Sequence, residues 1–194
     1  SLMETTFPAL WVREEGQEPR ALVVQGPRVR DWTGEGQGYW SLGQGQFFKQ
    51  MDGLPGFDAV EFDGTFPFAR VKFQKAGFPL DVELSAFNPF IPRDERSSSF
   101  PLACLVYRLT NRSSRTVDLS LVWSMMNPVG EKQPDASGAS DRARVQEFCD
   151  GDVHGLLFAN DRFEADSPHY GTAALTTRCA QTTAISQWQS SGWF

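Results

Sequence analysis

The sequence predicts an all-β fold, an antiparallel two-sheet β-sandwich with long loops and little helix. Three observations predict it. Several segments alternate apolar and polar residues with a period of two, short β-rich segments are bounded by Gly, Pro, Asn or Asp, and helical periodicity is nearly absent. Many short strands separated by frequent turns indicate two packed antiparallel sheets.

The length and composition favour one domain. The chain of 194 residues is 40% hydrophobic, with 16 Phe and 6 Trp, which is enough apolar material for a substantial core. Two polar or Gly-rich stretches, residues 32–46 and 131–140, are predicted as exposed loops, and neither looks like a domain boundary. We therefore expect a single β-sandwich domain over residues 1–194.

The strands are justified in chain order by their residue types. In residues 80–86 the apolar Leu80, Val82 and Leu84 alternate with polar residues, which gives an extended segment one apolar and one polar face. Shorter β-rich segments bring the total to about nine strands. The expected strands cover residues 21–25, 60–62, 71–73, 80–86, 105–109, 117–123, 156–159, 173–177 and 182–187.

Two further segments allow specific expectations. Residues 105–109 and 117–123 flank the polar stretch Asn-Arg-Ser-Ser-Arg, which predicts a hairpin between them. Residues 141–148, with Asp141 as a possible N-cap, read equally well as a helix or a strand.

Charge and cysteine content argue against several classes of protein. The formal charge is −6 and the basic residues are scattered, so nothing resembles the basic surface that binds nucleic acid. No apolar run approaches the roughly 20 residues of a transmembrane segment, and no signal-like start is seen. Cys104, Cys149 and Cys179 lack a CxxC pair and are interpreted as free thiols. These features lead us to expect a cytoplasmic location.

No catalytic residue, metal site or cofactor site is predicted. Glu61 and Asp63 share the polar face of a strand, which is the face expected to meet water. His154 and His169 have no metal-ligand spacing and no adjacent nucleophile. The glycines of residues 34–38 lack the framing of a nucleotide-binding loop.

Aromatic residues are the remaining candidates for ligand contact. Trp32, Tyr39 and Trp40 lie in or beside a Gly-rich stretch, where exposed rings could support the C–H face of a sugar. The favoured alternative is that these rings fold back into the core or pack against a neighbouring domain. Five phenylalanines in strand-like contexts are expected in the core. They are Phe66, Phe68, Phe73, Phe87 and Phe90.

The stretch from Gly53 to Gly130 resembles a known family. The segments GLPGF (53–57), EFDGTFPFA (61–69), SAFNPFIP (85–92) and SSFP (98–101), followed by YRLTN and SMMNPVG, keep the order and spacing of the N-terminal domain of the non-lysosomal glucosylceramidase or bile-acid β-glucosidase family, glycoside hydrolase family 116. The Gly-rich segment that usually precedes this region in the family has no counterpart. Either a first strand is missing or the chain is an atypical member.

The resemblance implies a division of labour within a larger enzyme. It implies a β-sandwich packed against a C-terminal (α/α)6 catalytic barrel that cleaves β-glucosides with retention, using a Glu nucleophile and an Asp acid/base. Neither residue has a matching position in this sequence, so the chain is expected to be a non-catalytic domain that supports the barrel. The alternative is a free-standing sugar-binding module.

Overall fold

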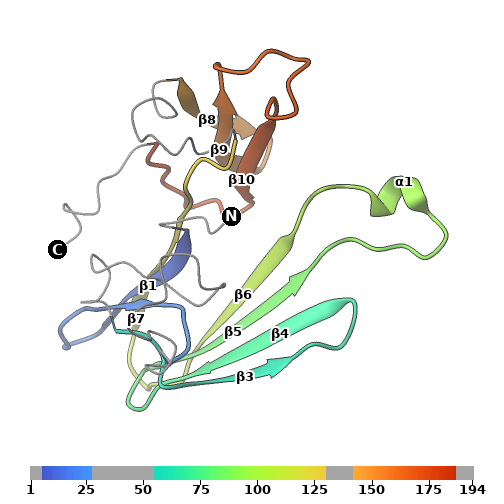
Figure 1. Cartoon of the computed structure of the whole chain (residues 1–194). Helices are drawn as coiled ribbons and strands as arrows, with labels where there is room; N and C mark the ends of the chain where they lie inside the picture. Colours follow the sequence, from blue (N-terminus) through green and yellow to red (C-terminus); the bar gives the residue numbers. More distant parts are fainter. Residues whose placement is uncertain (1–5, 28–54, 130–141, 187–194) are drawn as a thin grey trace, which may run out of the picture. The chain divides into compact units, whose positions relative to one another are not determined.

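The computed structural model describes residues 6–27, 55–129 and 142–186 (Figure 1). Its strands form three antiparallel sheets, and the helix found in the described residues is the single turn α1 (Glu95–Ser98). The predicted all-β class with little helix is therefore confirmed. The chain divides into a first unit, Phe7–Trp123, and a second unit, Ser1–Thr6 with Ser124–Phe194.

The smaller sheet of the first unit has the strand order β2-β1-β7, with β1 (Phe7–Glu14), β2 (Arg20–Val23) and β7 (Val117–Ser124). Gly16, at φ 75°, lies between β1 and β2. Strand β1 was not predicted. Its sequence FPALWVRE is a nearly continuous apolar run, and residues on both of its faces are buried, so no two-residue alternation is present to reveal it.

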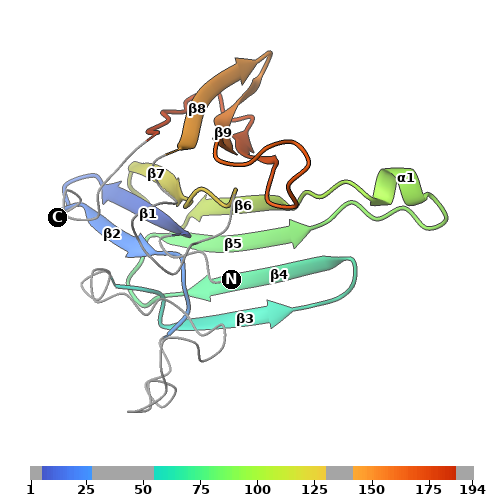
Figure 2. The same ribbon diagram turned by 45° about the horizontal axis from the view of Figure 1, so that its top comes forward.

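The larger sheet of the first unit is a four-stranded antiparallel meander (Figure 2). Its strands follow one another in space as they do in sequence. Short turns make the first two connections, and residues 88–103 form a longer third one. Turn residues recur between them, including Gly77 at φ 65°. The strands are β3 (Ala59–Asp63), β4 (Phe68–Gln74), β5 (Leu80–Phe87) and β6 (Cys104–Asn111).

The core of the first unit lies between these two sheets. Leu10 and Val12 of the smaller sheet form one cluster with Leu80 and Val82 of the larger sheet. Val24 and Phe57 also belong to the cluster, and Phe57 packs against one ring of β4 and one ring of the following turn. The first unit therefore has the face-to-face sheet packing of a sandwich.

Strands β6 and β7 are not a hairpin, so that prediction was wrong. Strand β6 pairs with β5, and β7 belongs to the other sheet. Asn111 closes the connection by accepting from the Ser113 N–H and donating to the Arg115 carbonyl. Tyr107, Leu109 and Val117 pack against the core, as the alternation indicates. Leu105, Leu119 and Leu121 of the same alternating patterns are exposed, and the pattern does not determine which strands pair.

The second unit contains an antiparallel sheet of order β10-β9-β8. Its strands are β8 (Ala143–Asp150), β9 (Val153–Asn160) and β10 (Thr172–Thr177), so the ambiguous segment at 141–148 lies largely in a strand. The side-chain amide of Asn127 donates to the carbonyl oxygens of Ala159 and Arg144 at 2.9 and 3.3 Å. The strand predicted at 182–187 is wrong over its described residues, 182–186, which have no strand partner.

Candidate functional site

The apolar face of the larger sheet continues well beyond the core. The strand register aligns four apolar residues in one row, Val60, Phe73, Val82 and Leu109. The smaller sheet covers this row at Val82, whose side chain is 1% exposed. The next row on the same face ends at Phe62, whose exposed fraction is 67%. The smaller sheet therefore covers only one end of this face.

The other end of the larger sheet, together with the two loops beyond it, displays large apolar side chains to solvent. We call these residues the apolar end surface. They are Phe62, Phe66, Phe68, Phe90, Ile91, Phe100, Leu102, Leu105 and Val106.

Three phenylalanines of this surface were expected in the core, and that prediction was wrong. Phe66, Phe68 and Phe90 are 74%, 43% and 51% exposed. Phe68 pairs with Phe87 on the face that carries Lys72, and Phe66 and Phe90 lie in loops beyond the strand ends. None of the three phenylalanines is on the face that packs against the smaller sheet. Phe73 does pack against the core, as predicted, and Phe87 is half-buried beside Phe68, with ring centroids 5.6 Å apart.

The opposite face of the larger sheet carries a charged row near its middle. The register places Glu61, Lys72, Glu83 and Arg108 in one row across all four strands, so the signs of neighbouring charges alternate. Pairs of this kind stabilise a sheet modestly and keep it solvated. This row is therefore suited to water, whereas Phe68 and Val106, nearer the end of the same face, are apolar and exposed.

Two carboxylates at the edges of the larger sheet hold turns in place. Asp58 accepts from the Ala76 N–H at 3.0 Å and from Lys75 Nζ at 3.1 Å, and these bonds hold its pKa below the ordinary value. Asp63 accepts from the Thr65 hydroxyl and N–H, which lowers its pKa as well. Both groups are thereby favoured in the ionised form that accepts these turn hydrogen bonds.

The loop between β5 and β6 extends beyond the ends of its two strands and carries α1 (Figure 2). The Phe90 ring of this loop contacts the Phe66 ring of the β3–β4 turn edge to face, with centroids 5.4 Å apart and planes at 70°. The two loops at this end of the sheet are thus joined by an aromatic contact. Because their planes lie at 70°, the two rings do not form a flat platform.

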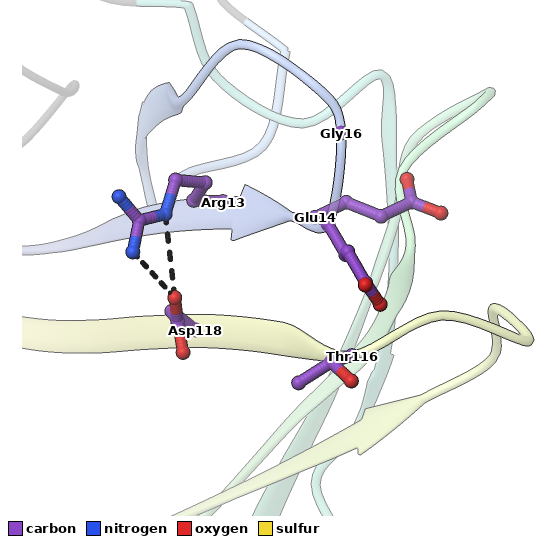
Figure 3. Close-up of a pocket in the computed structure, with 6 residues that line it drawn as sticks. Arg13, Glu14, Gly16, Thr116 and Asp118 are labelled. Carbon is purple, nitrogen blue, oxygen red and sulfur yellow. Dashed lines mark hydrogen bonds and ion pairs between the residues drawn. The ribbon is translucent and has the colours of Figure 1, made fainter.

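A shallow hollow of about 370 Å³ lies beside β1 and β7 (Figure 3). Glu14, Glu15, Gly16 and Thr116 line it together with an ion pair, in which the Arg13 guanidinium donates to Asp118 at 2.7 Å. Its lining holds one guanidinium and three carboxylates, and the ion pair itself is exposed. Arg13 and Asp118 bond to each other, so the hollow does not offer them as free catalytic groups.

The sugar-contact candidates Trp32, Tyr39 and Trp40 lie outside the described residues. Within the described ranges, no cluster of three or more His, Cys, Asp and Glu side chains has the arrangement of a metal site. No helix in those ranges is long and apolar enough to cross a membrane. Cys104, Cys149 and Cys179 are free thiols, with Cys104 half-buried.

Comparison with protein families identifies the chain. A family model described as beta-glucosidase 2, glycosyl-hydrolase family 116 N-term, matches residues 1–193. The chain belongs to this family. The family 116 resemblance noted in the sequence is therefore confirmed, and it extends over both units of the structure.

The segments that carry the family resemblance most clearly coincide with the apolar end surface. EFDGTFPFA runs through the β3–β4 turn, and SAFNPFIP and SSFP belong to the end of β5 and to the β5–β6 loop. Sequence reasoning missed four members of this surface outside the phenylalanines. A signal was present, since Ile91 and Leu102 are apolar residues next to prolines in a loop, where burial within the same domain is not expected.

Proposed function

We propose that this family 116 N-terminal domain is non-catalytic and packs against the (α/α)6 catalytic barrel of a retaining β-glucosidase or glucosylceramidase-like enzyme, which it supports. The observation that carries the proposal is the apolar end surface. Monomeric proteins rarely leave a contiguous group of large apolar side chains in water, and such groups mark contact surfaces. The family's description as the N-terminal part of a glycosyl hydrolase makes the rest of the same polypeptide the natural partner.

The difference between the charged row and the apolar residues of the larger sheet supports contact through the apolar end surface. The charged row that contains Lys72 and Glu83 would lose hydration if it were covered by another domain, whereas Phe62 and Leu105 would gain from burial. The apolar end surface is therefore the better candidate for contact with a second domain.

A free-standing sugar-binding module is the second candidate. The exposed rings of Phe66 and Phe90 favour it only weakly, because their planes lie at 70° and do not form the flat surface on which a sugar ring stacks. Trp32, Tyr39 and Trp40 stay candidates for sugar contact under this alternative. Titration of residues 1–194 with glucosides, monitored by tryptophan fluorescence, separates the two functions, because only a sugar-binding module should give a saturable change.

The direct test compares residues 1–194 with the full-length enzyme in hydrolysis of an aryl β-glucoside. We expect the full-length enzyme to be active and the separate segment to be inactive at equal molar concentration, because the nucleophile and the acid/base of the family belong to the barrel. Hydrolysis by the purified segment that is abolished by a carboxylate substitution such as Asp63→Asn would contradict the proposal.

A paired substitution tests the contact surface in the full-length enzyme. Phe62→Ser on the apolar end surface is expected to shorten the half-life of activity at elevated temperature by about tenfold, because it weakens the support of the barrel. Lys72→Ser on the charged face is the matched control and should change the half-life by less than about twofold. Equal effects of the two substitutions would remove the evidence for contact through the apolar side.

A further inference from the structure

The β5–β6 loop, residues 88–103, combines exposed apolar side chains with a backbone that is held in one shape. Loops of this length are usually either functional or disordered. Three prolines, Pro89, Pro92 and Pro101, restrict its backbone. The large apolar side chains that it exposes are Phe90, Ile91, Phe100 and Leu102.

Side-chain hydrogen bonds close the loop at its base and middle. At the base, Asn88 Nδ2 donates to the Leu102 carbonyl at 2.8 Å. In the middle, the Ile91 N–H donates to Ser98 Oγ at 2.9 Å, and the same hydroxyl donates back to the Ile91 carbonyl at 3.1 Å. Ser98 therefore bonds both backbone polar groups of an exposed apolar residue.

The tip of the loop is fixed in the same way. Asp94 caps α1 by accepting from the Ser97 N–H at 2.9 Å and from the Ser97 hydroxyl at 2.7 Å. Arg93, immediately before the cap, has a φ of 69°, a left-handed conformation that is uncommon outside glycine. The loop thus keeps a defined backbone although its apolar side chains are not buried.

A loop that is already ordered loses less conformational entropy when it docks than a mobile loop does. We propose that the β5–β6 loop is the principal docking element of this domain, inserting Phe90 and Ile91 into an apolar groove on the catalytic domain of the same polypeptide, with Ser98 and Asn88 as positioning residues. This inference rests on the proposed function, and it adds which element dominates the contact and how its shape is maintained.

The same polypeptide is the occupant that the observations favour. The family places this domain at the N-terminal side of a glycosyl hydrolase, so the partner is covalently linked and present at high effective concentration. A projecting loop requires a concave apolar partner. The hollow at Arg13 and Asp118 on a second copy is lined by charged groups and does not match Ile91.

Thiol labelling of the full-length enzyme tests the loop directly. Ile91→Cys, Phe62→Cys and Thr110→Cys are made in a background whose native cysteines are replaced by Ser, and the rate of reaction with a maleimide is measured. Thr110 is the exposed control on the charged face of β6. We expect Ile91→Cys to react at least about tenfold more slowly than Thr110→Cys, at a rate independent of protein concentration.

Three outcomes would overturn the inference in different ways. Equal reactivity of Ile91→Cys and Thr110→Cys with protection of Phe62→Cys would leave the proposed function standing but assign the contact to the sheet. Full reactivity of both Ile91→Cys and Phe62→Cys would remove the proposed function as well. Protection of Ile91→Cys that disappears on dilution would assign the loop to a second copy of the chain.

The positioning role of Ser98 has its own test, again by the reactivity of Ile91→Cys. Ser98→Ala removes both hydrogen bonds to Ile91 and should raise the labelling rate of Ile91→Cys severalfold, whereas Ser98→Thr keeps the hydroxyl and should restore protection. If Ser98→Thr behaves like Ser98→Ala, or if neither changes the rate, Ser98 does not position the loop.

Discussion

Val82 and Val106 belong to adjacent strands of the same sheet, yet their surroundings differ completely. Val82 is buried in the cluster shared by the two sheets, and Val106 is exposed on the apolar end surface. Both are branched apolar residues in a strand with a period of two. The register pairs Val82 with Leu109 and Val106 with Ser85, so the two valines lie on opposite faces of the larger sheet, and the smaller sheet covers only the face of Val82.

This contrast predicts a large difference in the cost of the same substitution. Val82→Ala should lower the free energy of unfolding by about 2 kcal/mol, because it removes buried methyl groups and leaves a cavity. Val106→Ala should lower it by less than about 0.5 kcal/mol. Urea unfolding followed by tryptophan fluorescence measures both values, and equal costs would mean that the core does not lie between the two sheets.

The carboxylate of Asp58 predicts a loss of stability in acid. Its pKa in the folded state is lowered below the ordinary value of 3.8 by hydrogen bonds from Ala76 and Lys75. A lowered folded pKa stabilises the fold at pH values above 3.8, and this contribution disappears as the pH falls below 3.8 through the folded pKa. Asp58→Asn should therefore make the melting temperature fall less steeply across this acid range.

Two comparisons make the acid prediction specific. The Asp58→Asn variant should have a lower melting temperature than the parent at neutral pH, with the two values converging in acid. Glu61→Gln, at an exposed position on β3, serves as the matched carboxylate control. A parallel shift of the Asp58→Asn melting temperature at every pH would show that the charge of Asp58 is not involved.

At the scale of elements, the connection between β6 and β7 shows that a two-residue alternation does not determine which strands pair. Tyr107 and Val117 pack against the core, but the chain crosses from one sheet to the other at residues 111–116 instead of turning back within one sheet. The Arg112 N–H bonds to the Pro79 carbonyl, and the Thr116 carbonyl accepts from the Glu15 N–H. These non-local backbone bonds decide the topology, and a local sequence pattern does not contain them.

The sheet of the second unit depends on a close approach at Gly155. A Cβ atom at this position of β9 would lie 2.4 Å from the carbonyl oxygen of Leu175 on β10. Gly155→Ala should therefore push β9 and β10 apart and lower the free energy of unfolding by about 2 kcal/mol or more. Gly171→Ala, where a Cβ would meet no atom within 4 Å, is the control with little expected change.

Hydrogen exchange distinguishes the local effect of Gly155→Ala from a global one. The amide protons of β9 and β10 should lose protection first, while those of β4 and β5 in the first unit should change less. A uniform loss of protection through both units would instead show that they unfold as one cooperative body.

At the scale of the whole molecule, the apolar end surface predicts that the domain is more stable inside its enzyme than alone. Burial of this surface stabilises the folded domain and not the unfolded chain, so contact with the partner domain raises the melting temperature of this domain. We expect a difference of about 5 to 10 °C between residues 1–194 and the same residues in the full-length enzyme, measured by hydrogen exchange during heating. Equal stability in the two contexts would contradict packing through this surface.

The sequence by itself determined the all-β class, the positions of most strands and the family, because alternation, turn residues and short motifs are local properties of the chain. The tertiary structure alone decided which apolar residues are core and which are surface. Phe73 and Phe62 lie in the same kind of strand pattern, and only the reach of the smaller sheet buries one and exposes the other. The length over which two sheets overlap depends on contacts between residues far apart in the chain, such as Leu10 with Val82, and no local pattern encodes it.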